Sequence, residues 1–312
     1  MTGINLPSVL VLMGGPDAER EVSLASGTQV AAALRDCGCY RVVEQVIDAP
    51  TADELHQIAE SAGAEVVFPV LHGQWGEGGP LQELLEQLHL PYVGSNPRAA
   101  ALAMDKLATK RLLAAKAVPT PRAEQLNPAE VCTISPPLVL KPIDDGSSVD
   151  LRICRTADEV AAAQAQLGPR RSRLMAEQYI AGREITVGVV LGQALPLIEI
   201  IPAAEYYDYD AKYTRDDTRY VVNPDLPQAM IDQFTALALL AHECVGCRDV
   251  SRVDFLLDQR GPWFLEINTM PGFTTHSLVP MAAAAIGLNM PDLCAKLVEA
   301  ARTRRPRPVH AE

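Results

Sequence analysis

Residues 263–278 read WFLEINTMPGFTTHSL, and this stretch decides how the chain is interpreted. An apolar run ends in Glu266, and Asn268 follows two residues later. Residues two apart on a β-strand face the same side, so both oxygen-bearing side chains share one face. A loop rich in glycine, proline and hydroxyl residues comes next. A hydrophobic strand that ends in this way indicates that its last residues have a chemical partner.

The preceding apolar run, VSRVDFLL at 250–257, supplies that partner, because DQRG joins it to the second run and predicts a β-hairpin. If residues 258–262 form the loop, Asp254 lies opposite Glu266 and Arg252 lies opposite Asn268. Facing carboxylates repel each other unless a cation lies between them. Oxygen ligands of this kind suit Mg²⁺ bound together with substrate phosphates. The alternative is a surface ion-pair network, which the apolar flanks disfavour.

Composition narrows the class of protein. A chain of 312 residues suits two or three domains, and a net charge of −12 argues against nucleic-acid binding. The N-terminal apolar run is only as long as a strand, so we expect neither a signal peptide nor a membrane span. Seven scattered cysteines indicate reduced thiols, and hence a cytoplasmic protein.

The first third alternates strand and helix patterns, and this order predicts a parallel, doubly wound domain over residues 1–97. We expect strands at 7–15, 40–47, 64–73 and 91–95. Ligands bind at the carboxyl ends of strands in such sheets, and here those ends carry Gly14-Gly15 and His72-Gly73. The rest of the chain predicts two further units, which we place at residues 98–185 and 186–312.

The sequence predicts one helix over 96–117. After this helix, strand and helix patterns are mixed in both of the further units. Residues 205–227, EYYDYDAKYTRDDTRYVVNPDLP, are longer than an ordinary loop and are therefore either disordered or functional. Their five tyrosines argue against disorder.

A second group of residues has the composition of a nucleotide site. VLKPIDDGSSVD at 139–150 places Lys141 on a strand before a Gly146-Ser147-Ser148 turn, whose N–H and hydroxyl groups can bind phosphate. The Walker A pattern is absent, and an ordinary turn explains this segment equally well. A carboxylate of AEQYIAGRE, Glu177 or Glu184, can accept from ribose hydroxyls, although surface glutamates are the alternative. For Lys106 a solvated lysine is equally reasonable.

Taken together, these segments resemble the D-alanine–D-alanine ligases of the ATP-grasp superfamily over almost the whole chain. The resemblance rests on MGGPDAEREVSL, LHGQWGEGG, AMDKL, LKPIDDGSSV, YDYDAKY, SRVDFLL and FLEINTMPGFTTHSLVP, in the order of the family. It implies a three-domain ATP-grasp fold of α/β and α+β type, with ATP held between the central and C-terminal domains. It also implies a homodimeric enzyme that makes D-alanyl-D-alanine for peptidoglycan, with two Mg²⁺ ions for which Mn²⁺ can substitute.

The resemblance also implies a role for individual residues. Lys106, Lys141, Gly146 and Ser148 match the residues that bind the phosphates in the family. Glu177 and Glu184 match the residues at the adenine and the ribose. The two metal ions are bound in the family by residues that match Asp254, Glu266 and Asn268. The first D-alanine corresponds to Glu19 for its ammonium and His72 near its carboxylate, with Ser147 and Tyr213 bonded to that glutamate. Lys212 and Ser277 match the groups that bind the carboxylate of the second substrate in the family. Arg252 and the Gly272 N–H match the groups of the oxyanion hole. Residues 205–227 correspond to a loop that closes over the site.

Three positions depart from the family pattern: Gly78, Glu83 and Asp150. They bear on loop rigidity and local charge, and they remove no group assigned to the chemistry. Two other functions remain open: a related ligase whose acceptor is D-lactate, D-serine or another amino acid, and a nucleotide-binding sensor without catalysis. The intact DAKY at 210–213 favours an amino acceptor.

Overall fold

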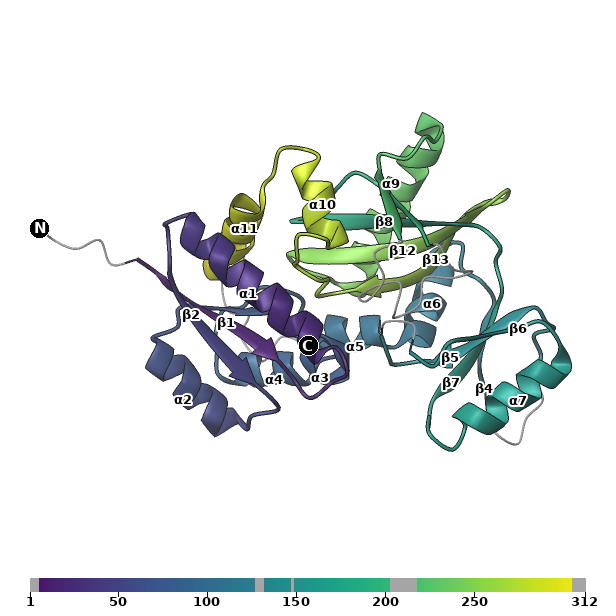
Figure 1. Cartoon of the computed structure of the whole chain (residues 1–312), viewed down its shortest axis with the longest axis horizontal. Helices are drawn as coiled ribbons and strands as arrows, with labels where there is room; N and C mark the ends of the chain where they lie inside the picture. The colour runs from purple at the N-terminus through teal and green to yellow at the C-terminus, as the bar shows by residue number, and fades with distance from the viewer. Residues whose placement is uncertain (1–5, 127–131, 147–148, 203–217, 305–312) are drawn as a thin grey trace, which may run out of the picture.

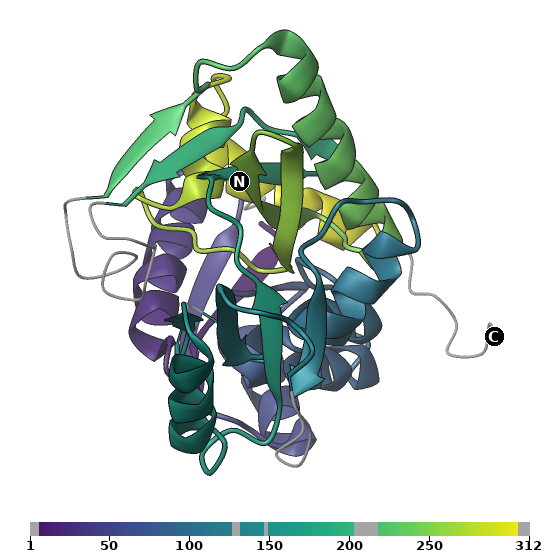
Figure 2. The same ribbon diagram turned by 90° about the vertical axis from the view of Figure 1, so that its right-hand side faces the viewer.

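The structure is a computed structural model that describes residues 6–126, 132–146, 149–202 and 218–304. Within these residues the strands form a parallel sheet at the N-terminal end, an antiparallel four-stranded sheet and a six-stranded sheet. In Figure 1 the N-terminal sheet lies on the left and the four-stranded sheet at the lower right, with the six-stranded sheet above it. Figure 2 turns the molecule so that the four-stranded sheet faces the viewer. The predicted positions Ser147, Ser148, Lys212 and Tyr213 lie outside the described residues.

The N-terminal sheet has the order β2-β1-β3, with β1 at Ser8–Gly14, β2 at Arg41–Ile47 and β3 at Val66–Pro69. Alternate residues of β1 pack on opposite faces. Val9 and Val11 join the core with α1 (Arg20–Asp36), while Leu10 and Leu12 join the core with α2 (Ala52–Ala62) and α4 (Pro80–Gln87). The doubly wound arrangement is therefore confirmed. The fourth strand expected at 91–95 is reduced to one parallel bridge, between Val67 and Tyr92.

The helix predicted over 96–117 is two helices, and this prediction was wrong. The first, α5, spans Pro97–Met104, and the second, α6, spans Lys106–Ala114. Asp105 separates them: its extended backbone ends α5, and its carboxylate caps α6 by accepting from the Ala108 N–H at 2.8 Å. Aspartate is a preferred N-cap residue, so Asp105 was a visible signal for a break at this point.

The four-stranded sheet has the order β4-β7-β5-β6 and is antiparallel. Its strands are β4 (Ala123–Leu126), β5 (Leu138–Pro142), β6 (Arg152–Cys154) and β7 (Leu174–Gln178), and α7 (Ala157–Leu167) covers it. The segments PPLVLKPI, LRICRT and RLMAEQYI have the sequence pattern of strands and ADEVAAAQAQLG that of a helix, and they form β5, β6, β7 and α7, whereas β4 was not foreseen. The sheet places Lys141 of β5 and Glu177 of β7 on adjacent strands.

The six-stranded sheet follows the path β11-β10-β8-β12-β13, and β9 pairs with β8. Its strands are β8 (Arg183–Val190), β9 (Gln193–Ala194), β10 (Ile198–Ile201), β11 (Arg219–Val222), β12 (Val250–Asp258) and β13 (Gly261–Asn268). The predicted hairpin is β12–β13. The helix α9 (Gln228–Val245) packs on the sheet through Phe234, which meets Phe255 edge to face at a centroid distance of 5.4 Å.

The last helices connect the two ends of the chain. After α10 (Leu278–Ala284), α11 (Met290–Thr303) packs against α1 and β3, and the Tyr40 hydroxyl donates to the Ala295 carbonyl at 3.3 Å. Buried Asp249, just before β12, accepts from the Gly94 N–H at 2.7 Å and pairs with Arg304. The C-terminal segment therefore holds the N-terminal sheet against the six-stranded one. The boundaries at 97 and 185 stay a prediction.

We expect Phe255→Ala to lower the free energy of unfolding by about 3–5 kcal/mol, because the ring is fully buried between Phe234 and Phe264. Urea unfolding followed by tryptophan fluorescence would measure the change. Ile286→Ala is the control, since Ile286 is 59% exposed and its truncation should change stability by less than about 0.5 kcal/mol. Equal effects of the two substitutions would contradict the assigned core.

Candidate active site

A cavity of about 450 Å³ lies where the six-stranded sheet meets loops of the N-terminal sheet. The predicted residues that line it are Glu19, His72, Gly146, Glu184, Arg252, Asp254, Glu266, Asn268, Gly272 and Ser277. Lys106 lines an adjoining hollow that shares Gly146, Glu266 and Asn268 with it. A larger hollow of about 710 Å³ between β2 and α2 contains none of the predicted residues. Residues predicted from five separate parts of the chain therefore meet at one place.

The hairpin reaches its predicted pairing by an unexpected route. Asp258 pairs with Gly261, so the turn contains only Gln259 and Arg260 rather than the five residues expected. That register alone would place Asp254 opposite Leu265. A β-bulge shifts the register between Asp254 and Phe255, and beyond it Asp254 faces Glu266. The facing pairs were predicted correctly, and the loop length was wrong.

Each carboxylate of the facing pair has a cationic partner. Asp254 is 5% exposed and accepts from Arg252 Nη2 at 2.8 Å and Nε at 3.0 Å. It also accepts from the Thr186 hydroxyl of β8 at 2.6 Å and from Asn268 Nδ2 at 3.1 Å. Glu266 pairs with Lys106 at 3.2 Å. These contacts offset the repulsion between the two acids. Sequence reasoning gave Thr186 no role, because a threonine in a strand carries no distinctive signal.

The donors on the hairpin are two carboxylates and one amide. Among the described residues, no group of three or more His, Cys, Asp or Glu side chains is arranged to hold a metal ion. The protein therefore offers only part of a coordination shell. Hard cations such as Mg²⁺ are commonly bound in this way, by one or two carboxylates together with substrate phosphates. The donor set fits such an ion.

Lys106 is not the solvated lysine that its helix pattern allowed. It is the first residue of α6 and is 8% exposed, and its ammonium donates to the Asp145 carbonyl at 2.6 Å. Burial lowers its pKa, but Glu266 and Asp145 more than compensate, so the pKa lies above its ordinary value. Lys106 thus stays charged between the acidic hairpin and the turn before Gly146.

Glu177 of β7 is 3% exposed, so it is not a surface glutamate. Its Oε2 is 2.7 Å from Lys141 Nζ, and its Oε1 is 2.5 Å from Lys110 Nζ. Burial raises the pKa of Glu177, but the two ammonium groups outweigh it and hold the pKa below its usual value. Burial lowers the pKa of Lys110 to about 8. Sequence reasoning missed Lys110, which looked like one of several lysines on a helix.

The N-terminal sheet contributes Glu19, just before α1, and His72, just before α3 (Gly73–Glu77). A Cβ added to Gly146 would lie 2.9 Å from Glu19 Oε2, so only glycine lets the two segments approach this closely. His72 Nδ1 is 3.1 Å from the Met270 carbonyl and therefore carries the proton, while the buried Nε2 has no partner among the described residues. Burial lowers the pKa of His72 and keeps the ring neutral.

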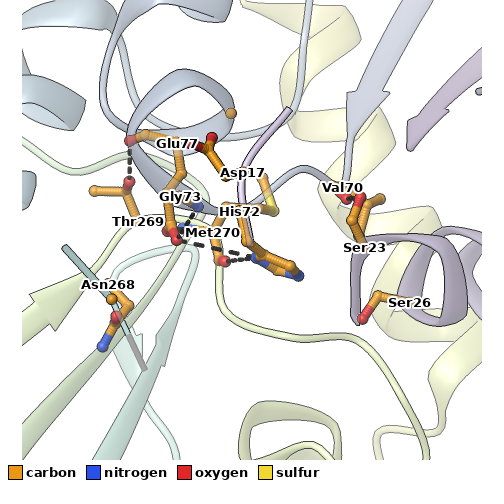
Figure 3. A network of polar contacts seen from close by, with 12 residues as sticks. Asp17, Ser23, Ser26, Val70, His72, Gly73, Glu77, Asn268, Thr269 and Met270 are labelled. Carbon is orange, nitrogen blue, oxygen red and sulfur yellow. Dashed lines mark hydrogen bonds and ion pairs between the residues drawn. The ribbon is translucent and has the colours of Figure 1, made fainter. Parts of the chain in front are cut away.

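Glu77 is a site residue to which sequence reasoning assigned no role, although it is part of LHGQWGEGG. Its carboxylate accepts from the N–H groups of Gly73 and Met270, each at 3.3 Å, and lies 4.0 Å from His72 Nδ1. Figure 3 shows these groups together, with Asn268 at the end of its strand close by. Burial, reinforced by the charge of Glu19, raises the pKa of Glu77 to about 8. The side chain is therefore largely protonated at neutral pH.

The loop after β13 closes another side of the cavity. The Phe273 N–H donates to the Ser26 hydroxyl of α1 at 3.1 Å, which fixes the loop against the N-terminal sheet. The Ser277 hydroxyl accepts from the Thr274 N–H at 2.9 Å. A Cβ on Gly272 would lie 2.8 Å from that same hydroxyl. The lack of a side chain at Gly272 therefore lets its backbone approach Ser277 at the cavity wall.

Comparisons with known proteins agree with this site. The family model described as the D-ala D-ala ligase C-terminus matches residues 112–299, and the corresponding N-terminus model matches residues 44–95. Curated D-alanine–D-alanine ligases of Syntrophotalea carbinolica and Bordetella pertussis are 39% and 43% identical, over 95% of this chain and 97% and 96% of theirs.

Solved structures show the same relationship. The D-alanine–D-alanine ligase of Bacillus anthracis complexed with ATP superimposes with a TM-score of 0.84 at 31% identity, over 96% of this chain and 97% of that one. The D-alanine–D-alanine ligase of Coxiella burnetii superimposes with a TM-score of 0.82 at 30% sequence identity, over 96% of this chain and 94% of that one. These structures confirm the ATP-grasp fold predicted from the sequence. With this fold, and with the predicted side chains gathered at one cavity, the chain belongs to the D-alanine–D-alanine ligase family.

Proposed function

We propose that this protein joins two D-alanine molecules with ATP, and so forms D-alanyl-D-alanine, ADP and phosphate for peptidoglycan synthesis. One observation carries the proposal. The cavity of about 450 Å³ has the acidic pair Asp254 and Glu266 on one wall and Glu19 with His72 on another. A nucleotide with its cation and an amino acid can therefore lie side by side. Family membership supplies the identity of the amino acid.

In the first step a carboxylate oxygen of the first D-alanine attacks the γ-phosphorus of ATP, and ADP leaves. The product is an acyl phosphate, a far better electrophile than a carboxylate. Glu19 holds the substrate ammonium by charge, and the unpartnered His72 Nε2 is a polar atom available to the substrate. Lys106 and Lys141 neutralise phosphate charge as it moves, and Gly146 is assigned to the same phosphates. Ser147 and Ser148 are proposed to assist from the same turn.

In the second step the amine of the second D-alanine attacks the acyl carbon and loses a proton, and the tetrahedral intermediate expels phosphate. Its oxyanion needs donors already in place. We assign this role to Arg252 and the Gly272 N–H, and binding of the second carboxylate to Ser277 and Lys212. Tyr213 is proposed to act with Ser147 and Glu19. We also propose that the segment 205–227, of which residues 205–217 lie outside the described residues, keeps water from the acyl phosphate.

We assign a pair of Mg²⁺ ions to Asp254, Glu266 and Asn268, with Mn²⁺ able to substitute. When bound, such ions neutralise the β- and γ-phosphate oxygens. The partial shell on the hairpin supports the assignment, because two carboxylates and an amide leave positions for phosphate oxygens. Glu184 lines the same cavity and is assigned to the ribose, and Glu177 to the adenine.

We further propose a homodimer in the cytoplasm, where ATP is available. All seven cysteines are free thiols, which suits a reducing compartment. In the described part of the chain no helix is long and apolar enough to cross a membrane. Sedimentation equilibrium would test the dimer.

Purified protein with Mg-ATP should release ADP when D-alanine is added and not when L-alanine is added. Mass spectrometry of the product should show D-alanyl-D-alanine. A panel that includes D-serine and D-lactate tests the acceptor. A depsipeptide or a mixed dipeptide as the main product would show that the acceptor is another compound and not D-alanine. ADP release that does not depend on any amino acid would exclude the ligase activity.

Arg252→Ala should lower kcat by about 10²–10³-fold, the usual effect of removing one oxyanion donor. The matched control is Arg260→Ala in the turn of the same hairpin, because Arg260 stacks on Trp263 away from the cavity. The control should keep wild-type kcat. Full turnover by Arg252→Ala would remove this arginine from the chemistry.

Glu77→Gln should change how stability depends on pH. The folded-state pKa of Glu77 is raised to about 8 from 4.5, so the folded protein binds a proton that the unfolded chain releases. Wild-type stability should therefore fall between pH 4.5 and 8 relative to Glu77→Gln, by about 1.4 kcal/mol per pH unit. Urea unfolding across this range measures the difference. Parallel stability curves for the two proteins would show that Glu77 is ionised in the fold.

A further inference from the structure

Lys110 has no assigned role, yet it occupies a position where three parts of the fold meet. It lies on α6 and is 2% exposed. Its ammonium contacts Glu177 of β7 at 2.5 Å, and it donates to the Phe264 carbonyl of β13 and to the Thr120 hydroxyl, each at 3.1 Å. The Thr120 hydroxyl donates to the same carbonyl at 3.1 Å. Lys110 thus links the four-stranded sheet to the six-stranded sheet.

Burial of the Lys110 ammonium is energetically unfavourable, and its contacts indicate which structural role offsets this. Glu177 already has Lys141 as a partner at 2.7 Å, so neutralising the carboxylate does not require a second lysine. Two lysines and one glutamate leave a net positive charge inside the protein, which is unfavourable unless the geometry serves a purpose. What Lys110 adds is a fixed position for the second oxygen, Oε1. It does so relative to β13, the strand that carries Glu266 and Asn268.

The remaining bonding capacity of Glu177 indicates its ligand. A carboxylate has about four acceptor positions, and the two ammonium groups occupy one on each oxygen. Oε1 is buried, and apart from the ion pair with Lys110 at 2.5 Å it has no hydrogen-bond partner in the described structure. A buried acceptor held in this way suits a donor such as an exocyclic amine. The 6-amino group of adenine is such a donor, whereas the 6-oxo group of hypoxanthine is not.

We propose that Lys110 is a positioning residue that holds Glu177 for the 6-amino group of the nucleotide and so sets the preference for adenine over 6-oxopurine nucleotides. This rests on the proposed function, in which the nucleotide base lies at Glu177. Lys110 itself does not touch the nucleotide. Its effect passes through the orientation of one carboxylate, and so it alters which base is bound rather than the chemical step.

The test is the affinity for ADP and for IDP, measured by titration calorimetry with Mg²⁺, because these products bind without any ligation. The wild type should bind ADP at least about tenfold more tightly than IDP, since a buried carboxylate left without its donor is penalised. Lys110→Met should reduce this ratio to about threefold or less, mainly by weakening ADP. Lys110→Arg should recover part of the preference. Lys116→Met is the matched control, because Lys116 is exposed just beyond α6.

An unchanged ADP/IDP affinity ratio in Lys110→Met overturns the inference. This includes an equal loss of affinity for both nucleotides, which a purely structural lysine would give. If Lys110→Met does not fold, Thr120→Val removes one partner of the ammonium and keeps its charge. An unchanged ratio in Thr120→Val then counts against the inference, and a lowered ratio supports it. A wild type that binds ADP selectively but makes no dipeptide would refute the proposed ligase alone.

Discussion

One extra residue in β13 determines the geometry of the site. The two-residue turn at Gln259 and Arg260 would by itself place Leu265 opposite Asp254, and Glu266 would face the other side of the sheet. The bulge at Leu265 shifts the register by one residue, so Glu266 and Asp254 lie opposite each other. Bulges often adjust the direction of a side chain at a functional site, and this one brings two carboxylates together.

Bringing carboxylates together is unfavourable without cations, and lysine and arginine side chains around the site supply positive charge. Arg252 and Lys106 each contact one acid of the pair, and Lys141 and Lys110 both contact Glu177. Each of these three carboxylates therefore has at least one cationic partner. A triphosphate with its metal ions, as we propose, enters a site where both signs of charge are already arranged, so little reorganisation is needed.

Much of this was predictable from the sequence, for identifiable reasons. The order of strands and helices in the first third follows from hydrophobic periodicity. Strand parity places Arg252 with Asp254 on one face and Glu266 with Asn268 on one face, whereas the pairing of Asp254 with Glu266 was predicted with a five-residue loop and is reached through a bulge. The bulge at Leu265 was not predictable, because an apolar residue in an apolar strand carries no signal of register. The roles of Lys110 and Glu77 depend on burial by distant segments, which spacing along the chain does not report. The break at Asp105 could have been found from its capping preference. The positions Ser147, Ser148, Lys212 and Tyr213 stay predictions.

A crystal structure with Mg²⁺ and a non-hydrolysable ATP analogue tests the central claim most directly. It should show metal density between Asp254 and Glu266, with Asn268 as a further ligand and phosphate oxygens completing the shell. Nucleotide density in the hollow between β2 and α2, or carboxylates of the hairpin without a metal ion beside bound nucleotide, would contradict it.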